Sequence, residues 1–270
     1  GSPNIAPEPS IMKVLQESIM VPENYKYAIN ELPEMKSAIH DWYKNRYNVE
    51  LTYDEMICLQ GSQEALSTLF LAMCDPGDIV LVPDPYYPIF SDGPKIAGAK
   101  VEYMPLLQEN NYVIQLDQID EEIAKKAKMM IVSYPNNPTC AVAPDSFYEE
   151  LIQFAKKYDI VVLHDNAYSE LVFDGKVGKS FLSFEGAKDV GIELNSFSKT
   201  YGMAGARLGV CVGNKDVIEC YNTLKSNMDY GIFLPIQYAG IEALRHGGAS
   251  IHSTCQAYQD RRDALCEAFD

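Results

Sequence analysis

Side chains capable of chemistry follow several of the strands expected in this sequence. Gly-Ser-Gln at 61–63 opens an expected helix, where backbone N–H groups and a hydroxyl favour binding of a phosphate or another anion. Asp165 comes shortly after the apolar run 160–163, and a carboxylate is costly to bury unless it meets a cation or a strong donor. Lys199 lies in a glycine-containing loop between two apolar runs, which is unusual for a merely solvated lysine.

Three further residues extend this set. Arg207 follows Lys199 by eight positions and suits bidentate phosphate binding, because the guanidinium is planar. Asn137 and Tyr168 lie in loops that follow expected strands and can donate hydrogen bonds. A lysine near a cation in a dry pocket has a lowered pKa and can form a Schiff base with a carbonyl. One ligand that uses all of these groups is pyridoxal 5′-phosphate (PLP), whose phosphate, aldehyde and ring nitrogen need an anion cradle, an amine and a carboxylate.

Each of these features also has a purely structural explanation. Ser62 is at a position where serine commonly caps a helix, and Asp165 has the same option. The Asn-Pro pair within 133–139 is typical of a plain turn. The combination therefore carries the argument, and no single residue does.

The elements that must position these residues alternate between strands and helices. Strands are expected at 56–59, 79–82, 101–104, 129–133, 160–163, 190–194 and 208–212. Helices are expected at 10–20, 33–47, 64–74, 116–128 and 144–158, and from 215 onward, with one long helix over 250–270. This order predicts an α/β fold, a three-layer α/β/α sandwich with a mostly parallel central sheet. Ligands of such sheets bind at the carboxyl ends of the strands, where the residues above lie.

Composition excludes several classes of protein. The 270 residues include 22 Lys+Arg and 38 Asp+Glu, a formal net charge of −16, which argues against nucleic-acid and anionic-membrane binding. No apolar run approaches the ~20 residues of a membrane-spanning helix. The seven cysteines contain no Cys-x-x-Cys pair, which favours reduced thiols and a cytoplasmic location. The four histidines have no metal-ligand spacing, so no metal site is expected.

Several motifs occur in an order that resembles the class I/II aminotransferases of PLP fold type I, the aspartate aminotransferase superfamily. They are Ser-Tyr-Pro-Asn-Asn-Pro-Thr at 133–139, His-Asp-Asn-Ala-Tyr at 164–168, and the run from Ser196 to Arg207. The stretch 185–199 is similar to the branch that holds LL-diaminopimelate, alanine and aspartate aminotransferases. Cys140 departs from the family, which usually has glycine after Asn-Pro-Thr.

The resemblance implies a role for each matching residue. Catalytic roles fall to Lys199, which forms the Schiff base and moves the Cα proton, to Asp165 at the ring nitrogen, and to Tyr168 at the ring oxygen. The implied cofactor-binding residues are Ser62, Gln63, Tyr87, Asn137, Asp165, Tyr168, Ser196, Ser198, Lys199, Arg207 and, reaching the neighbouring subunit, Tyr27. Tyr86 is the alternative to Tyr87 as the aromatic on the ring face, and Tyr25 is the alternative to Tyr27.

The implied activity is transfer of an amino group from an L-amino acid to a 2-oxo acid, with 2-oxoglutarate as the expected acceptor and ping-pong kinetics. The implied partners are these substrates and a second copy of the chain in a homodimer. The alternatives are a PLP-dependent C–S β-lyase or another PLP enzyme of this fold, a PLP-binding sensor domain, and a catalytically incomplete fragment.

The resemblance also divides the chain. It predicts an N-terminal segment at 1–30, the fold type I large domain at 31–249, and at 250–270 the start of a helix leading to a small domain outside this chain. Gly1-Ser2 is expected to be native-like sequence, because 1–4 resembles an internal Gly-Ser-Pro-Asp segment of the family. The arginine that holds the substrate α-carboxylate in the family is expected in the small domain.

Overall fold

A computed structural model describes residues 3–269; the expectation for Gly1 and Ser2 lies outside this range, as does Asp270. The described residues form one seven-stranded sheet with the order β1-β7-β6-β5-β4-β2-β3. Its strands are β1 (Met56–Leu59), β2 (Ile79–Asp84), β3 (Lys100–Pro105), β4 (Ala127–Ser133), β5 (Val161–Asp165), β6 (Gly191–Ser196) and β7 (Gly209–Gly213). The pairs from β3 to β6 are parallel, and β7 is antiparallel to both β6 and β1. The mostly parallel sheet is therefore confirmed.

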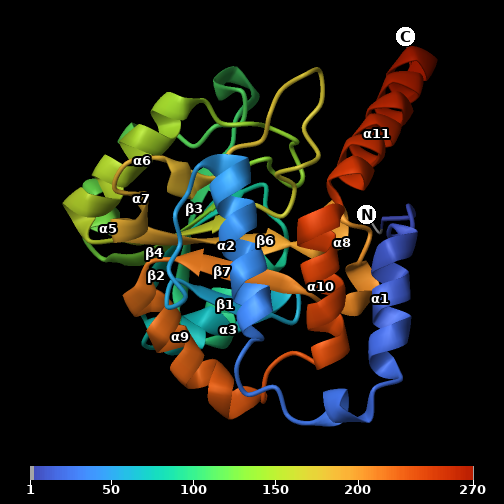
Figure 1. Ribbon diagram of the computed structural model, residues 1–270. Helices are drawn as coiled ribbons and strands as arrows, with labels where there is room; N and C mark the ends of the chain where they lie inside the picture. Colours follow the sequence, from blue (N-terminus) through green and yellow to red (C-terminus); the bar gives the residue numbers. More distant parts are fainter. Residues whose placement is uncertain (1–2, 270) are drawn as a thin grey trace.

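Helices cover both faces of the sheet (Figure 1). The layer with α2 packs against α10, which packs against α1, and α6 joins the same core. In the opposite layer, α3 packs against α4 and α9. The helices are α1 (Pro9–Ile19), α2 (Pro33–Tyr47), α3 (Gln63–Met73), α4 (Ile89–Ile96), α5 (Glu121–Ala124), α6 (Asp145–Tyr158), α7 (Ala187–Val190), α8 (Phe197–Thr200), α9 (Lys215–Met228), α10 (Leu234–His246) and α11 (Gly248–Phe269). Short 3₁₀ turns cover Pro22–Tyr25, Gln108–Asn110, Leu116–Gln118, Phe181–Ser183 and Ala204–Ala206.

Strand β4 shows how the two layers are separated. Met130 and Val132 belong to the core under α2 and α6, whereas Met129 and Ile131 belong to the core under α3 and α9. Successive strand residues point to opposite faces, so a strand covered on both sides must be apolar throughout. The three-layer prediction is confirmed by this alternation.

The helix expected over 116–128 is wrong. The chain forms a 3₁₀ turn at Leu116–Gln118 and the short helix α5, and β4 already begins at Ala127. The Asp120 carboxylate accepts hydrogen bonds from the backbone N–H groups of Glu122 and Ile123 and so starts a new helix. Apolar residues from two short elements together give this segment the spacing of one helix.

Helix α4 was not expected, because Gly93 and Pro94 interrupt its sequence. A Cβ built at Gly93 would lie 2.1 Å from the carbonyl oxygen of Leu66 in α3. The glycine therefore allows α4 to approach α3 closely, and this packing outweighs the low helix propensity of the segment.

Helix α11 extends away from the body of the molecule, at the upper right of Figure 1. Thr254 is its buried residue. It begins at Gly248, two positions before the expected start at 250. Among residues 3–269, no helix is both long enough and apolar enough to cross a membrane.

Glu193 on β6 is a fully buried carboxylate at the face covered by α2. It accepts hydrogen bonds from the Tyr43 hydroxyl at 3.0 Å and from the Phe181 backbone N–H at 2.8 Å. The Ser180 hydroxyl donates to it, and His164 Nδ1 lies 3.0 Å from Oε2. Burial and the Glu193 carboxylate hold the pKa of Tyr43 well above its ordinary value, so this phenol remains a donor. The network ties α2 and the 180–181 turn to the sheet.

We expect Glu193→Ala to lower the free energy of unfolding by about 3–5 kcal/mol, because it leaves several buried donors without an acceptor. Urea unfolding at pH 7 measures the change. The exposed Glu219→Ala in α9 is the control and should stay within about 0.5 kcal/mol of the wild type. Equal losses in the two variants would contradict the proposed role of the network.

Candidate active site

A cavity of about 380 Å³ lies at the carboxyl edge of the sheet. Its walls come mainly from the segments that follow β1, β2, β4, β5 and β6, together with the loop before β7. Ten residues predicted for the site line it: Ser62, Gln63, Tyr87, Asn137, Asp165, Tyr168, Ser196, Ser198, Lys199 and Arg207. The structure therefore brings together residues that are up to 145 positions apart in the chain (207 − 62).

The turn between β1 and α3 forms one wall. Gly61 has φ of 76°, in the left-handed region that glycine adopts without strain. Ser62 is the N-cap residue of α3, yet its side chain makes no capping hydrogen bond, so its hydroxyl is not used by the helix. The Tyr87 hydroxyl donates to Gln63 Oε1 at 3.0 Å, which holds this ring over the first turn of α3.

The loop after β4 carries Asn137. Its neighbour Asn136 shapes the turn, since Asn136 Oδ1 accepts hydrogen bonds from the backbone N–H and the hydroxyl of Thr139. Cys140 has φ of 60° and donates its backbone N–H to the carbonyl of Asn136. The left-handed conformation explains why glycine is usual at this position in the family that the sequence resembles.

Asp165 is the last residue of β5 and is 6% exposed. Its Oδ1 accepts the Ala167 backbone N–H at 3.3 Å. Burial raises the pKa of Asp165 to about 6, against a smaller lowering influence of His164. Burial and the Asp165 carboxylate raise the pKa of Tyr168 from its ordinary value. A cationic group bound beside Asp165 would stabilise its ionised form.

Lys199 lies on α8, a single helical turn that follows β6 directly. The Ser196 hydroxyl caps this turn by accepting the Ser198 backbone N–H at 3.2 Å. Partial burial and, to a smaller extent, the nearby Arg207 lower the pKa of the Lys199 amine. Its Nζ lies 5.9 Å from the centre of the Tyr168 ring. A larger fraction of this amine is therefore unprotonated and nucleophilic at neutral pH than for an exposed lysine.

Arg207 is held against the turn after β1. Its Nη1 donates to the carbonyl of Ala204 at 2.9 Å, and its Nη2 donates to the carbonyl of Gln60 at 3.4 Å. A Cβ built at Gly61 would lie 2.5 Å from Nη2, so glycine lets the guanidinium lie here without a shift of the arginine side chain. Arg207 and the N-terminus of α3 thus face the same end of the cavity.

The aromatic residues considered for the site lie in different places. Tyr86 stacks on Tyr103 and does not line the cavity, whereas Tyr87 does. Tyr27 is 79% exposed and packs against Tyr230, outside the cavity. Its predicted reach into a neighbouring subunit stays a prediction. The cavity is also lined by Pro3, Leu66, Ala167 and Ala204, which carry no reactive group that a sequence search could have found.

The donor set fits PLP. An amine with a lowered pKa suits the aldehyde, and a buried carboxylate with a raised pKa suits a cationic ring nitrogen. Arg207, the Ser62 and Ser198 hydroxyls and the N-terminus of α3 suit a phosphate dianion.

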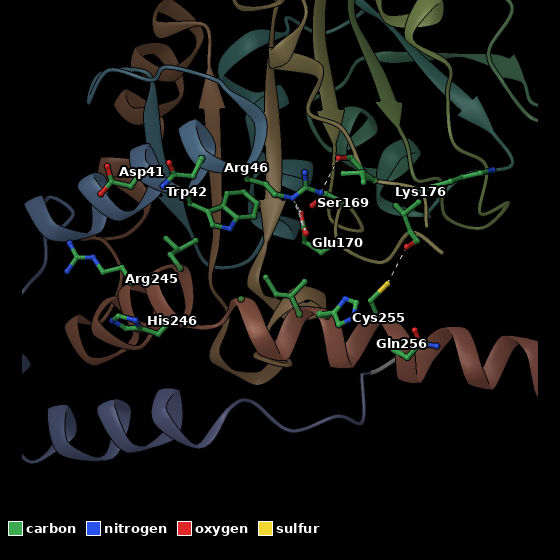
Figure 2. A pocket seen from close by; sticks show the side chains of 18 of the residues that line it. Asp41, Trp42, Arg46, Ser169, Glu170, Lys176, Arg245, His246, Cys255 and Gln256 are labelled. Atoms are coloured by element: carbon green, nitrogen blue, oxygen red, sulfur yellow. Dashed lines mark hydrogen bonds and ion pairs between the residues drawn. The ribbon is translucent and has the colours of Figure 1, made fainter. Parts of the chain in front are cut away.

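Two further cavities lie near this site. One of about 610 Å³ shares Asn137, Tyr168 and Lys199 with it and extends to Arg262 on α11. A larger one of about 1010 Å³ lies between α2, the loop 169–178 and α11 (Figure 2). In it Arg46 Nε donates to Glu170 at 3.0 Å, and the Cys255 thiol donates to the carbonyl of Val172. None of the predicted site residues lines this larger cavity.

The sequence matches the family model for aminotransferase class I and II over residues 3–270. The chain belongs to this aminotransferase family. It is 47% identical to an LL-diaminopimelate aminotransferase of Halothermothrix orenii over 271 residues, covering all of this chain and 70% of that protein. An LL-diaminopimelate aminotransferase of Moorella thermoacetica is 43% identical with the same coverage. This transaminase is thus similar to the expected branch, and its family implies PLP as the cofactor.

Solved structures agree with the fold of this aminotransferase. Substrate-bound BacF from Bacillus subtilis aligns with a TM-score of 0.96 at 38% identity, over 99% of this chain and 69% of that one. A probable N-succinyldiaminopimelate aminotransferase from Thermus thermophilus aligns with a TM-score of 0.94 at 31% identity, over 99% of this chain and 73% of that one. The fold prediction is therefore confirmed by comparison as well as by topology.

The pKa of Asp165 makes the stability of the cofactor-free aminotransferase depend on pH. The folded pKa of about 6 exceeds the ordinary value of 3.8, so the folded state binds more protons and stability falls as pH rises between these values. We expect the free energy of unfolding of the wild type to fall by about 2 kcal/mol between roughly pH 4.5 and 7.5, and Asp165→Asn not to show this fall. Urea unfolding at the two pH values measures this. The exposed Asp117→Asn variant should show the same pH dependence as the wild type. If Asp165→Asn also shows it, the pH dependence does not come from Asp165.

Proposed function

We propose that this chain carries the PLP site of an enzyme that moves an amino group from an L-amino acid to a 2-oxo acid, with 2-oxoglutarate as acceptor. One observation carries the proposal: a lysine with a lowered pKa lines the same cavity as a buried aspartate and an arginine. We assign the PLP-binding large domain to 31–249, because all the strands and all predicted lining residues of this cavity fall within it.

When bound, PLP supplies an aldehyde that forms a Schiff base with an amine and a ring that accepts the electron pair left by a departing proton. Lys199 would hold the aldehyde, and its amine would serve as the base for the proton that leaves the substrate Cα. Asp165 would pair with the protonated ring nitrogen, and that positive charge would stabilise its buried carboxylate in the ionised form.

The other residues orient the cofactor and cover its ring. Asn137 and Tyr168 donate hydrogen bonds to the ring oxygen, and Tyr87 covers the ring face from its position against Gln63. Arg207 and the first turn of α3 hold the phosphate and thereby fix the distance from Lys199 to the aldehyde carbon.

The adjoining cavity of about 610 Å³ is our proposed site for the substrate side chain, since Lys199 lines both spaces. Its far wall contains Lys176 and Arg262, and Arg262 donates to both oxygens of Asp174 at 2.7 Å. Charged groups in the wall of this cavity favour an amino acid whose side chain ends in a charged group. The relatives named LL-diaminopimelate aminotransferase are consistent with such a substrate.

We propose that the working form is a homodimer. An exposed aromatic surface supports it, in which Tyr25 packs against Phe233 and Tyr27 packs against Tyr230. In this arrangement Tyr27 reaches the phosphate held by the neighbouring copy, and the exposed rings become buried.

We expect borohydride reduction in the presence of PLP to label Lys199, because its lowered pKa makes it the preferred amine in the cavity. Peptide mapping by mass spectrometry locates the label. Lys199→Ala should lose the label. Lys188→Ala, which changes a lysine on α7 that pairs with Glu55, should retain it. A label on another lysine in the wild type contradicts the assignment.

Turnover distinguishes the reaction. With an amino acid and 2-oxoglutarate, we expect glutamate to form. Lys199→Ala should lower the rate of glutamate formation by about 10²–10⁴-fold or more. Pyruvate with thiol in place of glutamate would indicate a C–S β-lyase instead. A label on Lys199 with no turnover would indicate a PLP-binding sensor domain or an incomplete catalytic unit.

A further inference from the structure

A buried cation lies just behind the phosphate end of the proposed site. Lys225 on α9 is 5% exposed, and its Nζ lies 2.7 Å from Glu64 Oε1 and 2.7 Å from Asp229 Oδ2. Lys225 does not line the cavity itself. Buried ion pairs seldom add net stability over apolar side chains of similar size, so stability alone is a weak reason for this arrangement.

The Glu64 carboxylate connects Lys225 to the turn between β1 and α3. Glu64 Oε2 accepts the backbone N–H of Gln60 at 2.6 Å, while Oε1 is held by Lys225. The carbonyl of the same Gln60 accepts Arg207 Nη2. A chain of polar contacts therefore runs from Lys225 through Glu64 and the Gln60 peptide to the guanidinium that faces the cavity.

Asp229 closes the network on the other side. Its Oδ2 accepts Gln60 Nε2 at 3.3 Å as well as Lys225, and its Oδ1 accepts the Gly231 backbone N–H at 2.8 Å. Gln60 is thus held through both its backbone and its side chain. The end of α9 and the start of α3 are fixed against each other at the residue that directly precedes Gly61 and Ser62.

We propose that Lys225 is a positioning residue for phosphate binding, acting through Glu64 and Gln60 on Arg207 and on the first turn of α3. The inference rests on the proposed function, in which that turn and Arg207 hold the cofactor phosphate. Without Lys225, Glu64 has no cation and turns toward water, so the Gln60 peptide and Arg207 lose a fixed geometry.

The test compares PLP with pyridoxal, which has the same aldehyde and ring but no phosphate. Binding of each to the 270-residue chain is measured by equilibrium titration of absorbance. We expect Lys225→Met to weaken PLP binding about tenfold, which corresponds to one charge-assisted hydrogen bond, and to change pyridoxal binding by less than about twofold. Lys188→Met removes a more exposed ion pair, to Glu55, away from the cavity and should change neither affinity.

A second variant guards against a folding defect. Glu64→Gln combined with Lys225→Met removes one charge of each sign, so only Asp229 loses its cation, and Asp229 keeps its hydrogen bonds to Gln60 and Gly231. This double variant should show the same selective loss for PLP. Equal losses for both compounds, or no loss for either, would overturn the inference while leaving the site intact. If the wild type binds neither compound through Lys199, the proposed function itself fails, and this inference fails with it.

Discussion

The parallel register of β4, β5 and β6 is the constraint on which the proposed site depends. Ser133 pairs with Asp165, and Asp165 pairs with Leu194, so β4 and β5 end at one level of the sheet and β6 ends two residues beyond it. Each then releases a loop or a helical turn at the same edge, which brings Asn137 and Lys199 to one cavity. A shift of one residue in β5 would turn Asp165 toward the opposite layer, because successive side chains alternate between faces.

The same alternation of side chains separates two buried carboxylates, Glu193 and Asp165, which have different roles. His164 and Asp165 are neighbours in β5, yet His164 meets Glu193 under α2 while Asp165 faces the cavity. Glu193 is surrounded by donors within the protein and serves the packing of α2. Asp165 accepts the Ala167 backbone N–H at 3.3 Å, and burial raises its pKa, so a cationic group bound in the cavity would stabilise its ionised form.

Sequence reasoning predicted the seven strands of the sheet and the polar residues that line the cavity, because apolar runs and the polar residues after them are local signals. It also preferred Tyr87, which lines the cavity, to Tyr86, which pairs with Tyr103 of β3. It was wrong for two helical segments. The short elements within 116–128 depend on the Asp120 cap, and α4 depends on Gly93 meeting Leu66 of another helix. The spacing of apolar residues contains neither of these contacts.

The contact between Gly61 and Arg207 has a consequence for how such a site can change over time. The guanidinium occupies the space that any side chain at position 61 would need, and the φ of 76° adds a second obstacle to replacement. A side chain at position 61 therefore makes two demands: the Arg207 guanidinium must move away from the turn, and the backbone must keep a φ that glycine adopts without strain. Replacing the arginine by a smaller residue removes the first demand and leaves the second.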